Sequence, residues 1–191
     1  MLTISIDAIF KGCKCFCGAL ERASNRLDSL TTMTDFPPSS PPCLNRLPGH
    51  VIRRLHQISV GIFHQETEAL NLTPLQYGAL LTVREQPGID QRTLARLIAL
   101  DTSTTAGVVD RLQARGLLER QLSPQDRRVR LLHITTAGRA LLEAAEPAVA
   151  RTQALILAPL SPSQQRNFIE LLNRLVAENN ALSRAPSDAG D

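Results

Sequence analysis

Four consecutive hydroxylated residues, Thr102 to Thr105, follow Asp101 at the start of a segment with helical character. Hydroxyl groups and the free amides of a helix N-terminus both donate to phosphate oxygens. Short side chains also let a helix backbone approach the base edges of the DNA major groove. This run therefore predicts the DNA-facing end of a helix.

An arginine-rich turn further along the chain offers a second kind of contact. Ser123-Pro124-Gln125-Asp126 is rich in turn-forming residues and leads into Arg127 and Arg128, with Arg130 just beyond. An arginine carried on a narrow two-stranded ribbon fits the minor groove of duplex DNA, where the potential is most negative. The turn is predicted to be the basic tip of a β-hairpin.

The positive charge of the 191-residue chain is regional. Its formal net charge of +3 is too small to identify a partner, but eight arginines and four carboxylates lie between Gln91 and Arg130. Such a distribution is expected where one surface meets a polyanion. The predicted DNA-binding residues are Gln91, Arg92, Thr102, Ser103, Thr104, Thr105, Arg111, Arg115, Arg127, Arg128 and Arg130.

Some of these arginines have structural alternatives. Arg111 and Arg115 have Asp110 and Glu119 nearby in sequence, and Arg111 is also a candidate partner for Asp126. For these two arginines the sequence leaves open whether they pair with carboxylates or with phosphates. Arg120 is expected to have a structural role.

Basic and histidine side chains accompany the apolar stripe of the segment 50–70. Arg53, Arg54, His56 and His64, with Tyr77 from the following segment, are predicted to line a pocket for a carboxylate effector, which they would meet by charge-assisted hydrogen bonds. Two alternatives remain open. The histidines pack structurally, or they form a metal site with His50, Glu66 or Glu68.

Catalysis has no support in the motifs. The chain has no Gly-x-Ser-x-Gly, His-Glu-x-x-His or phosphate-binding loop, so no catalytic residues and no cofactor are expected. Three cysteines lie close together at positions 13, 15 and 17, and the fourth is Cys43. Since Cys43 has only Arg46 as a basic neighbour, a reactive thiol is poorly supported.

Capping signals predict the order of the elements. Helices are expected over 50–70, from Thr73 to Glu85, over 93–100, from Asp101 to Gly116, from Thr135 or Thr136 to Leu157 with a bend near Pro147, and from Ser161 onward. Strands are expected over 117–122 and 129–134. Aromatic residues make up only 3% of the chain, which favours an aliphatic helical core. The predicted fold class is mainly α with a small β-hairpin wing.

The two ends of the chain carry weaker signals. Residues 34–48 contain five prolines, so residues 1–48 are predicted to be a disordered extension and linker, and residues 181–191 a flexible tail. Met33 is an alternative start. No apolar run approaches the length of a membrane span, and residues 1–10 are a poor secretion signal, so the protein is expected to be cytoplasmic.

The run Asp101-Thr102-Ser103-Thr104-Thr105-Ala106-Gly107-Val108-Val109-Asp110-Arg111-Leu112-Gln113-Ala114-Arg115-Gly116-Leu117, followed by Asp126-Arg127-Arg128-Val129-Arg130, resembles the MarR family of bacterial regulators. The resemblance covers about Leu47 to Asn179. It implies a domain over 49–180, with a winged helix-turn-helix over about 72–136 and dimerisation helices over about 49–70 and 136–180. Ala106 and Gly107 depart from the large polar residue that many members carry there, so base reading is expected to rest on the helix start and the wing.

The resemblance also implies a function. We expect a homodimer that binds a pseudo-palindromic site on double-stranded DNA as a repressor, and that leaves it when a small aromatic acid enters a pocket between the dimer interface and the winged domains. One alternative is a thiol- or metal-responsive regulator of the same fold. The other, from a different class, is a helical protein-interaction module without DNA binding. No membrane partner is expected.

Overall fold

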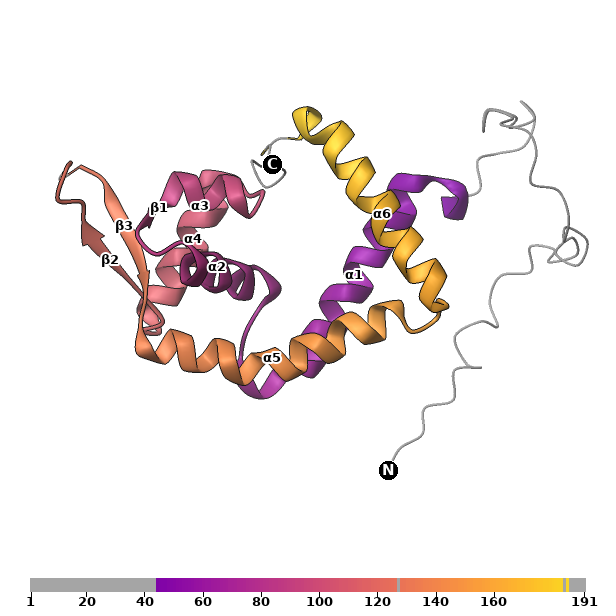
Figure 1. The fold of residues 1–191 in the computed structure, drawn as a ribbon, viewed down its shortest axis with the longest axis horizontal. Helices are drawn as coiled ribbons and strands as arrows, with labels where there is room; N and C mark the ends of the chain where they lie inside the picture. The colour runs from indigo at the N-terminus through magenta and orange to yellow at the C-terminus, as the bar shows by residue number, and fades with distance from the viewer. Residues whose placement is uncertain (1–43, 127, 184, 186–191) are drawn as a thin grey trace, which may run out of the picture. The chain divides into compact units, whose positions relative to one another are not determined.

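The computed structural model describes residues 44–126, 128–183 and 185, and it is mainly helical with one small sheet (Figure 1). This confirms the predicted fold class. The elements are α1 (Pro48–Glu66), α2 (Pro74–Glu85), β1 (Ile89–Asp90), α3 (Gln91–Leu97), α4 (Thr102–Ala114), β2 (Leu118–Leu122), β3 (Arg130–Ile134), α5 (Thr136–Leu157) and α6 (Pro162–Asn179). Short 3-10 helices lie over Leu44–Arg46, Glu68–Leu70 and Asn180–Leu182.

Helices α2, α4, α5 and α6 begin where the capping residues predict, whereas α1 and α3 each begin two residues before the predicted start, at Pro48 and Gln91. Thr73 and Ser161 each form a capping box, in which the side chain of the glutamine three residues later accepts the N–H of the cap residue. Asp90, Asp101 and Thr135 cap α3, α4 and α5 with their side chains. Each cap satisfies amides that a helix start would otherwise leave without a partner.

Two helices end earlier than predicted, and in each case a residue with a left-handed backbone follows within a few positions. In place of a helix that reaches residue 70, α1 ends at Glu66 and a 3-10 turn leads to Asn71, whose φ is 47°. In place of a helix that reaches residue 100, α3 ends at Leu97, and Ala99 has a φ of 52°. The predicted stop at Gly116 is confirmed, since this glycine has a φ of 68° just past the end of α4.

The three strands form an antiparallel sheet in the order β1-β3-β2. In the β2–β3 hairpin, Leu118 pairs with Ile134 and Leu122 with Arg130. Both hairpin strands begin one residue later than the sequence predicted. Strand β1 is not among the predicted elements, because a two-residue strand is too short to show an alternating pattern.

A single apolar core joins α2, α3, α4, the hairpin and α5. Its fully buried side chains include Leu80, Leu94, Leu112, Leu132 and Leu142. The first turn of α5 sits tightly on this core, because a Cβ at Gly138 would lie 2.2 Å from the Leu117 carbonyl oxygen. No larger residue fits at this position unless the backbone shifts.

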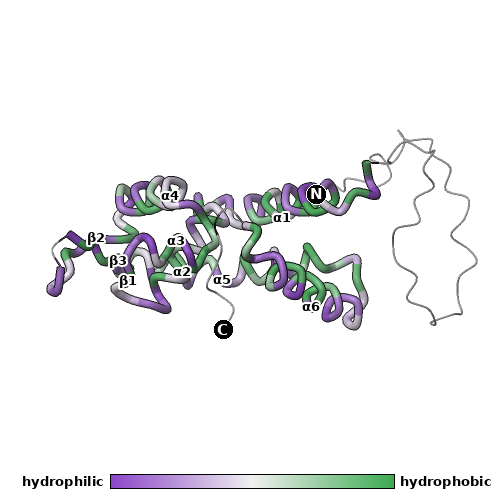
Figure 2. Tube along the Cα trace, turned by 90° about the horizontal axis from the view of Figure 1, so that it is seen from above, coloured by the Kyte–Doolittle hydropathy of each residue, from purple (hydrophilic) through white to green (hydrophobic). Residues whose placement is uncertain are grey.

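Helices α1 and α6 leave much of their apolar surface uncovered. α1 packs on α5, with an ion pair of 2.8 Å between Arg151 and Glu66, and its buried residue is Phe63. In α6, all of whose residues are described, none is buried. Figure 2 shows hydrophobic and hydrophilic residues alternating along both helices. The exposed large apolar side chains here are Val51, Ile52, Ile58, Ile169, Leu171, Leu175 and Val176.

Some predictions fall outside the described residues. These include most of the extension 1–48, all four cysteines, Arg127 and most of the tail. α5 is continuous through Pro147, the position at which the sequence predicts a bend. Among the residues that the structure describes, no helix combines the length and the apolarity needed to cross a bilayer.

Candidate nucleic-acid interface and ligand pocket

The N-terminal turn of α4 is organised by the Asp101 carboxylate. One oxygen accepts the backbone N–H of Thr104 at 2.8 Å, and the other accepts the Thr104 hydroxyl at 2.6 Å. These two bonds, the hydroxyl bond above all, hold the pKa of Asp101 below its ordinary value. Thr102, Ser103 and Thr104 are all exposed on this turn. The predicted helix start is therefore open to a ligand.

Thr105 corrects one prediction for this helix. Its side chain is fully buried, and its hydroxyl donates to the Asp101 carbonyl at 2.9 Å. Successive side chains on an α-helix are rotated by about 100°, so four consecutive residues cannot share one face. Thr105 therefore belongs to the inner face of α4 rather than to the surface predicted for DNA.

The middle of α4 carries a small residue beneath an arginine. Arg111 is exposed, and its Nη2 lies 3.6 Å from the position that a Cβ on Gly107 would take. The guanidinium thus folds back one turn along the helix over Gly107.

Asp126 is one of the partners that the sequence offers for Arg111. In the structure its carboxylate accepts the backbone N–H of Arg128 at 2.9 Å.

The tip of the hairpin is built around Ser123. This buried side chain is within hydrogen-bond distance of the backbone amides of Gln125 and Asp126, at 3.3 and 3.4 Å. The backbone N–H of Ser123 donates to the Val129 carbonyl at 3.0 Å, which closes the turn. The side chains of Arg128 and Arg130 are exposed on this framework. The turn is therefore internally bonded, while Arg128 and Arg130 face solvent.

Arg120 links the hairpin to α4 and α3, which confirms its expected structural role. Its guanidinium donates to Asp110 at 2.6 Å, to the side-chain oxygen of Gln113, and to that of Gln91 at 3.4 Å. The Asp110 carboxylate considered for Arg111 and Arg115 is thus bonded to Arg120. Gln91 is half-buried in this network, while Arg92 on the same helix is exposed.

The start of α3 is fixed by a second carboxylate. Asp90 accepts the backbone N–H groups of Arg92 at 2.8 Å and Thr93 at 3.0 Å, and the Thr93 hydroxyl at 2.7 Å. Partial burial raises the pKa of Asp90, but these hydrogen bonds outweigh it, so the pKa lies below its ordinary value. Both short helices of the helix-turn-helix therefore begin at an ionised cap.

Arg115 lies at the opposite end of α4 from the exposed hydroxyls. Its Nη1 donates to the Asn71 carbonyl at 2.7 Å and is 3.4 Å from Gln76 Oε1, while its Nη2 donates to the Leu70 carbonyl at 3.3 Å. All three acceptors lie in, or just after, the segment that joins α1 to α2. In this structure the Arg115 guanidinium is therefore bonded to that linker.

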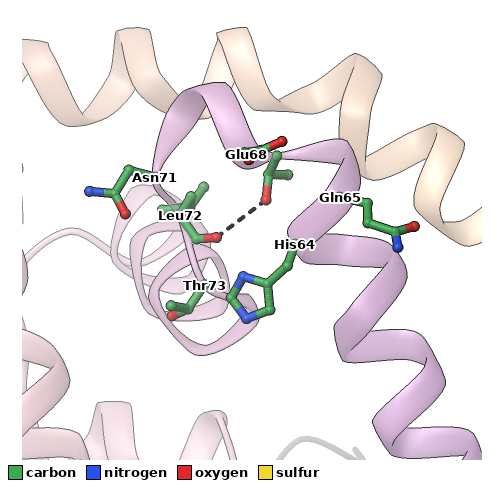
Figure 3. A pocket seen from close by; sticks show the side chains of 7 residues that line it. His64, Gln65, Glu68, Asn71, Leu72 and Thr73 are labelled. Atoms are coloured by element: carbon green, nitrogen blue, oxygen red, sulfur yellow. Dashed lines mark hydrogen bonds between the residues drawn. The ribbon is translucent and has the colours of Figure 1, made fainter.

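A pocket of about 350 Å³ opens where α1 leads into this linker (Figure 3). Thr67 is buried beneath it, with its hydroxyl 2.7 Å from the Phe63 carbonyl and 3.2 Å from the Leu72 carbonyl. The wall combines an imidazole, a carboxylate, amides and hydroxyls. The lining residues are His64, Gln65, Thr67, Glu68, Asn71, Leu72 and Thr73.

The five residues predicted for the effector site do not come together within one chain. His64 lines the pocket, whereas Tyr77 contacts Phe63 at a ring separation of 6.1 Å and packs against the core. Arg53, Arg54 and His56 are exposed on α1. At a rise of 1.5 Å per residue, His56 lies about 12 Å along the helix from His64. The predicted common pocket is therefore not formed within one chain, and only His64 of the five residues lines the pocket described above.

The alternative of a metal site gains no support. Among the described residues, no group of three His, Cys, Asp or Glu side chains is arranged to hold a metal ion. The cysteines of the thiol alternative lie outside that part of the chain.

Sequence reasoning missed the contribution of the linker to both the pocket and α4. Gln65, Thr67 and Asn71 line the pocket, whereas the sequence pointed only to their neighbours His64, as an effector contact, and Glu68, as a metal ligand. A local signal existed at Asn71, because asparagine tolerates the left-handed conformation that turns the chain before the Thr73 cap.

Comparison with known proteins gives consistent matches. The MarR family model matches residues 72–129. The HTH-type transcriptional repressor NicR of Pseudomonas putida is 31% identical over 128 residues, which make up 67% of this chain and 81% of that protein. The crystal structure of a probable transcriptional regulator from Pseudomonas aeruginosa matches with a TM-score of 0.67 and 38% identity, covering 70% of this chain and 99% of the other.

A third match is a protein whose DNA binding is regulated by a small molecule. The structure of Bordetella bronchiseptica BpsR, described as a mechanism for regulation of its DNA binding by 6-hydroxynicotinic acid, matches with a TM-score of 0.68 and 32% identity. The match covers 71% of this chain and 97% of that protein.

Proposed function

Because this chain belongs to the MarR family of transcriptional regulators, we propose that it is a homodimeric repressor that binds a pseudo-palindromic DNA site and is released by a small aromatic carboxylate. It is a winged-helix transcriptional regulator and not an enzyme. The proposal concerns its assembly, its DNA contacts and its effector.

The DNA contact is supported mainly by the open N-terminus of α4. Asp101 caps α4, while Thr102, Ser103 and Thr104 remain exposed at the end where backbone amides favour anions. Arg128 and Arg130 are exposed on the neighbouring hairpin. We propose that α4 enters the major groove and that the hairpin reaches the backbone and the minor groove, with Arg127 part of the same tip.

The dimer is supported by the apolar faces of α1 and α6. Leu175 and Val176 are 53% and 66% exposed, and α6 buries no residue within its own chain. Contiguous apolar surface of this kind marks an interface. A second copy of the chain is the occupant that fits the proposal, since two winged domains on one dimer would contact the two halves of a pseudo-palindrome.

The effector is supported by the chemistry of the pocket. His64 supplies a donor that becomes cationic when protonated, and the Glu68 carboxylate supplies an acceptor. A hydroxylated aromatic acid would present a carboxylate to the first and a hydroxyl to the second. The volume of about 350 Å³ lies within the range of small-molecule sites. BpsR, whose DNA binding is regulated by 6-hydroxynicotinic acid, provides a comparison.

The proposal is tested by asking whether the purified protein selects a duplex from a randomised pool. We expect an inverted repeat with half-sites about one helical turn apart, and an affinity that falls steeply with salt. Adding 6-hydroxynicotinic acid or 4-hydroxybenzoic acid should weaken binding, measured by fluorescence anisotropy. Benzyl alcohol is the control, because it keeps the ring and lacks the carboxylate.

Selection of no duplex would contradict DNA binding and favour the protein-interaction alternative. Enrichment of an inverted repeat that neither acid releases would retain the regulator and reject the proposed effector class. For the pocket itself, His64→Ala should reduce release by the acid without reducing the affinity for DNA.

A further inference from the structure

Arg115 joins two parts of the molecule that the proposed function requires to communicate. It is the C-cap residue of α4, and its guanidinium bonds to the linker that forms part of the pocket wall. We propose that Arg115 is a positioning residue that couples the pocket to the DNA-facing end of α4. This inference rests on the proposed function and assigns Arg115 a role other than the phosphate contact that the sequence suggested.

The contact has the geometry of a fork. The two terminal nitrogens of Arg115 donate to consecutive carbonyls, to Asn71 at 2.7 Å and to Leu70 at 3.3 Å. The planar guanidinium holds two acceptors in a fixed relation, which a single flexible cation does not do. The guanidinium therefore fixes the orientation of the linker backbone relative to α4 in addition to bonding to it.

The start of α2 is part of the same arrangement. Gln76 Oε1 accepts the backbone N–H of Thr73 at 3.2 Å within the capping box, and it lies 3.4 Å from Nη1 of Arg115. Gln76 is buried. Arg115 thus contacts both the linker and the capping box with which the linker ends. One side chain therefore bonds to both ends of the segment 70–76.

Apolar packing ties the same linker to the core beneath. Leu72 is buried in the cluster that contains Leu112 and Leu117, which flank Arg115 at the end of α4. The Leu117 N–H donates to the Leu112 carbonyl at 2.9 Å, which fixes the exit of the chain from the helix. The linker and the C-terminal end of α4 therefore share both a polar and an apolar attachment.

A ligand in the pocket would contact the residues that Arg115 holds. Asn71, Leu72 and Thr73 line the pocket, and Asn71 supplies the shorter of the two carbonyl contacts with Arg115 (Figure 3). Asn71 has a left-handed backbone, so a ligand that pushes the linker changes the direction of its carbonyl. Arg115 must then follow or lose its acceptors, and in either case the seating of α4 changes.

Coupling of this kind is reciprocal in binding free energy. If pocket occupation alters how α4 meets DNA, then DNA on α4 must alter the linker. This allows a test that needs no ligand. The amides of Leu70 and Asn71 are good reporters, because they donate to the carbonyls of Thr67 and Glu68 at 2.9 and 3.1 Å.

The experiment measures hydrogen exchange of residues 67–73 in the full-length protein, with and without the duplex selected from the randomised pool. In the wild-type protein, duplex binding should slow exchange in this segment by about fivefold or more, the lower end of typical allosteric coupling. In Arg115→Gln the slowing should be lost at duplex saturation. Arg115→Lys keeps the charge without the fork, and should lose most of the slowing.

Arg139→Gln is the matched control, since Arg139 is an exposed arginine on α5 rather than on α4. It should retain the wild-type slowing of hydrogen exchange.

The salt dependence of duplex binding separates the proposed role from a phosphate contact. A phosphate ligand would lower the slope of log affinity against log salt by about one when removed, whereas a coupling residue leaves the slope unchanged.

Equal slowing of hydrogen exchange in the wild type and both Arg115 variants would overturn the inference and leave the proposed function intact. A slope of log affinity against log salt that falls by about one in Arg115→Gln would do the same. No slowing in the wild-type protein bound to duplex would overturn it as well. If the wild-type protein selected no duplex, the proposed function would fail and this inference with it. Arg115→Lys keeps the test valid if Arg115→Gln does not fold.

Discussion

The winged-helix region and the pair α1 and α6 use apolar side chains in opposite ways. Most core leucines between Leu72 and Leu142 are enclosed, among them Leu80, Leu94 and Leu132, although Leu75 and Leu122 are exposed. The N-terminal turn of α4 exposes hydroxyl groups, and the hairpin tip exposes Arg128 and Arg130. On α6, Leu175 and Val176 face outward and no residue is buried. One region completes its core within the chain, and the other does not.

This contrast separates two sources of stability. Apolar area already buried stabilises the fold at any protein concentration, whereas area left on α6 contributes only when something covers it. The exposed surfaces also differ in the partners that they fit, since cations and hydroxyls suit a polyanion and an aliphatic face suits another aliphatic face. Substitutions in the winged-helix region should therefore change folding stability or DNA binding, whereas substitutions on α6 should change assembly.

The largest effect on folding is expected from Leu112→Ala. This fully buried leucine lies at the centre of the winged-helix core, so truncation should lower the free energy of unfolding by about 2–5 kcal/mol. Leu175→Ala in α6 is the matched substitution and should change the unfolding of the winged-helix region far less. Urea unfolding followed by circular dichroism measures both, and equal losses would break the comparison.

Val176→Glu should chiefly affect assembly. A carboxylate in the centre of the proposed interface would be desolvated without a partner, so the protein should become monomeric in light scattering. Loss of the second DNA-binding module should weaken operator binding by roughly 10²-fold or more. The winged-helix region should remain folded.

Ala177→Glu provides the control for this variant. The next residue points about 100° further round the helix, so the same charge should be tolerated there. If Val176→Glu left the molar mass unchanged, or if both variants dissociated alike, the apolar face of α6 would not be the interface.

Arg128→Ala should affect DNA alone. Removing an exposed cation from the hairpin tip should weaken duplex binding by roughly tenfold, about 1.4 kcal/mol, and reduce the salt slope by about one. The dimer mass and the unfolding transition should stay as in the wild type, and Arg139→Ala is the control cation. An unchanged affinity would remove the hairpin tip from the DNA interface.

The smallest expected effect concerns the cap of α4. Because the folded protein lowers the pKa of Asp101, the cap stabilises the fold fully above the unfolded value of about 3.9, and this stability is lost as the pH falls through the lower folded value. Thr104→Val removes the hydroxyl donor and should raise the pKa toward its ordinary value. Titration of the Asp101 carboxyl carbon by NMR measures this, and an identical titration in the variant would contradict the role of Thr104.

Local signals in the sequence predicted most of the fold. The capping boxes at Thr73 and Ser161, the aspartate caps and the stop at Gly116 each depend on residues within one turn of each other, and all are present. The periodic apolar residues between these signals then define the helices. What is local in the chain was therefore predictable from it.

The contacts that organise the candidate site are not local. Arg115 and its acceptors are 39 to 45 residues apart in the chain, and Arg120 reaches Gln91 across 29. A cluster of arginines in the sequence cannot indicate which of them is bonded within the protein and which faces solvent. The same limit applies to Arg53, Arg54, His56, His64 and Tyr77, whose spacing in the sequence does not show whether they share a pocket. Thr105 is a different case, because the rotation of about 100° per residue is a local property of the helix.

The close seating of Gly138 has a mechanical consequence. Since the Leu117 carbonyl leaves no clearance at this position, α5 cannot roll or slide where it leaves the hairpin without pushing the base of the hairpin. The whole helix has 22 residues, so it is about 33 Å long. A displacement of the first turn of α5 therefore also moves the base of the hairpin, where Leu117 lies against Gly138.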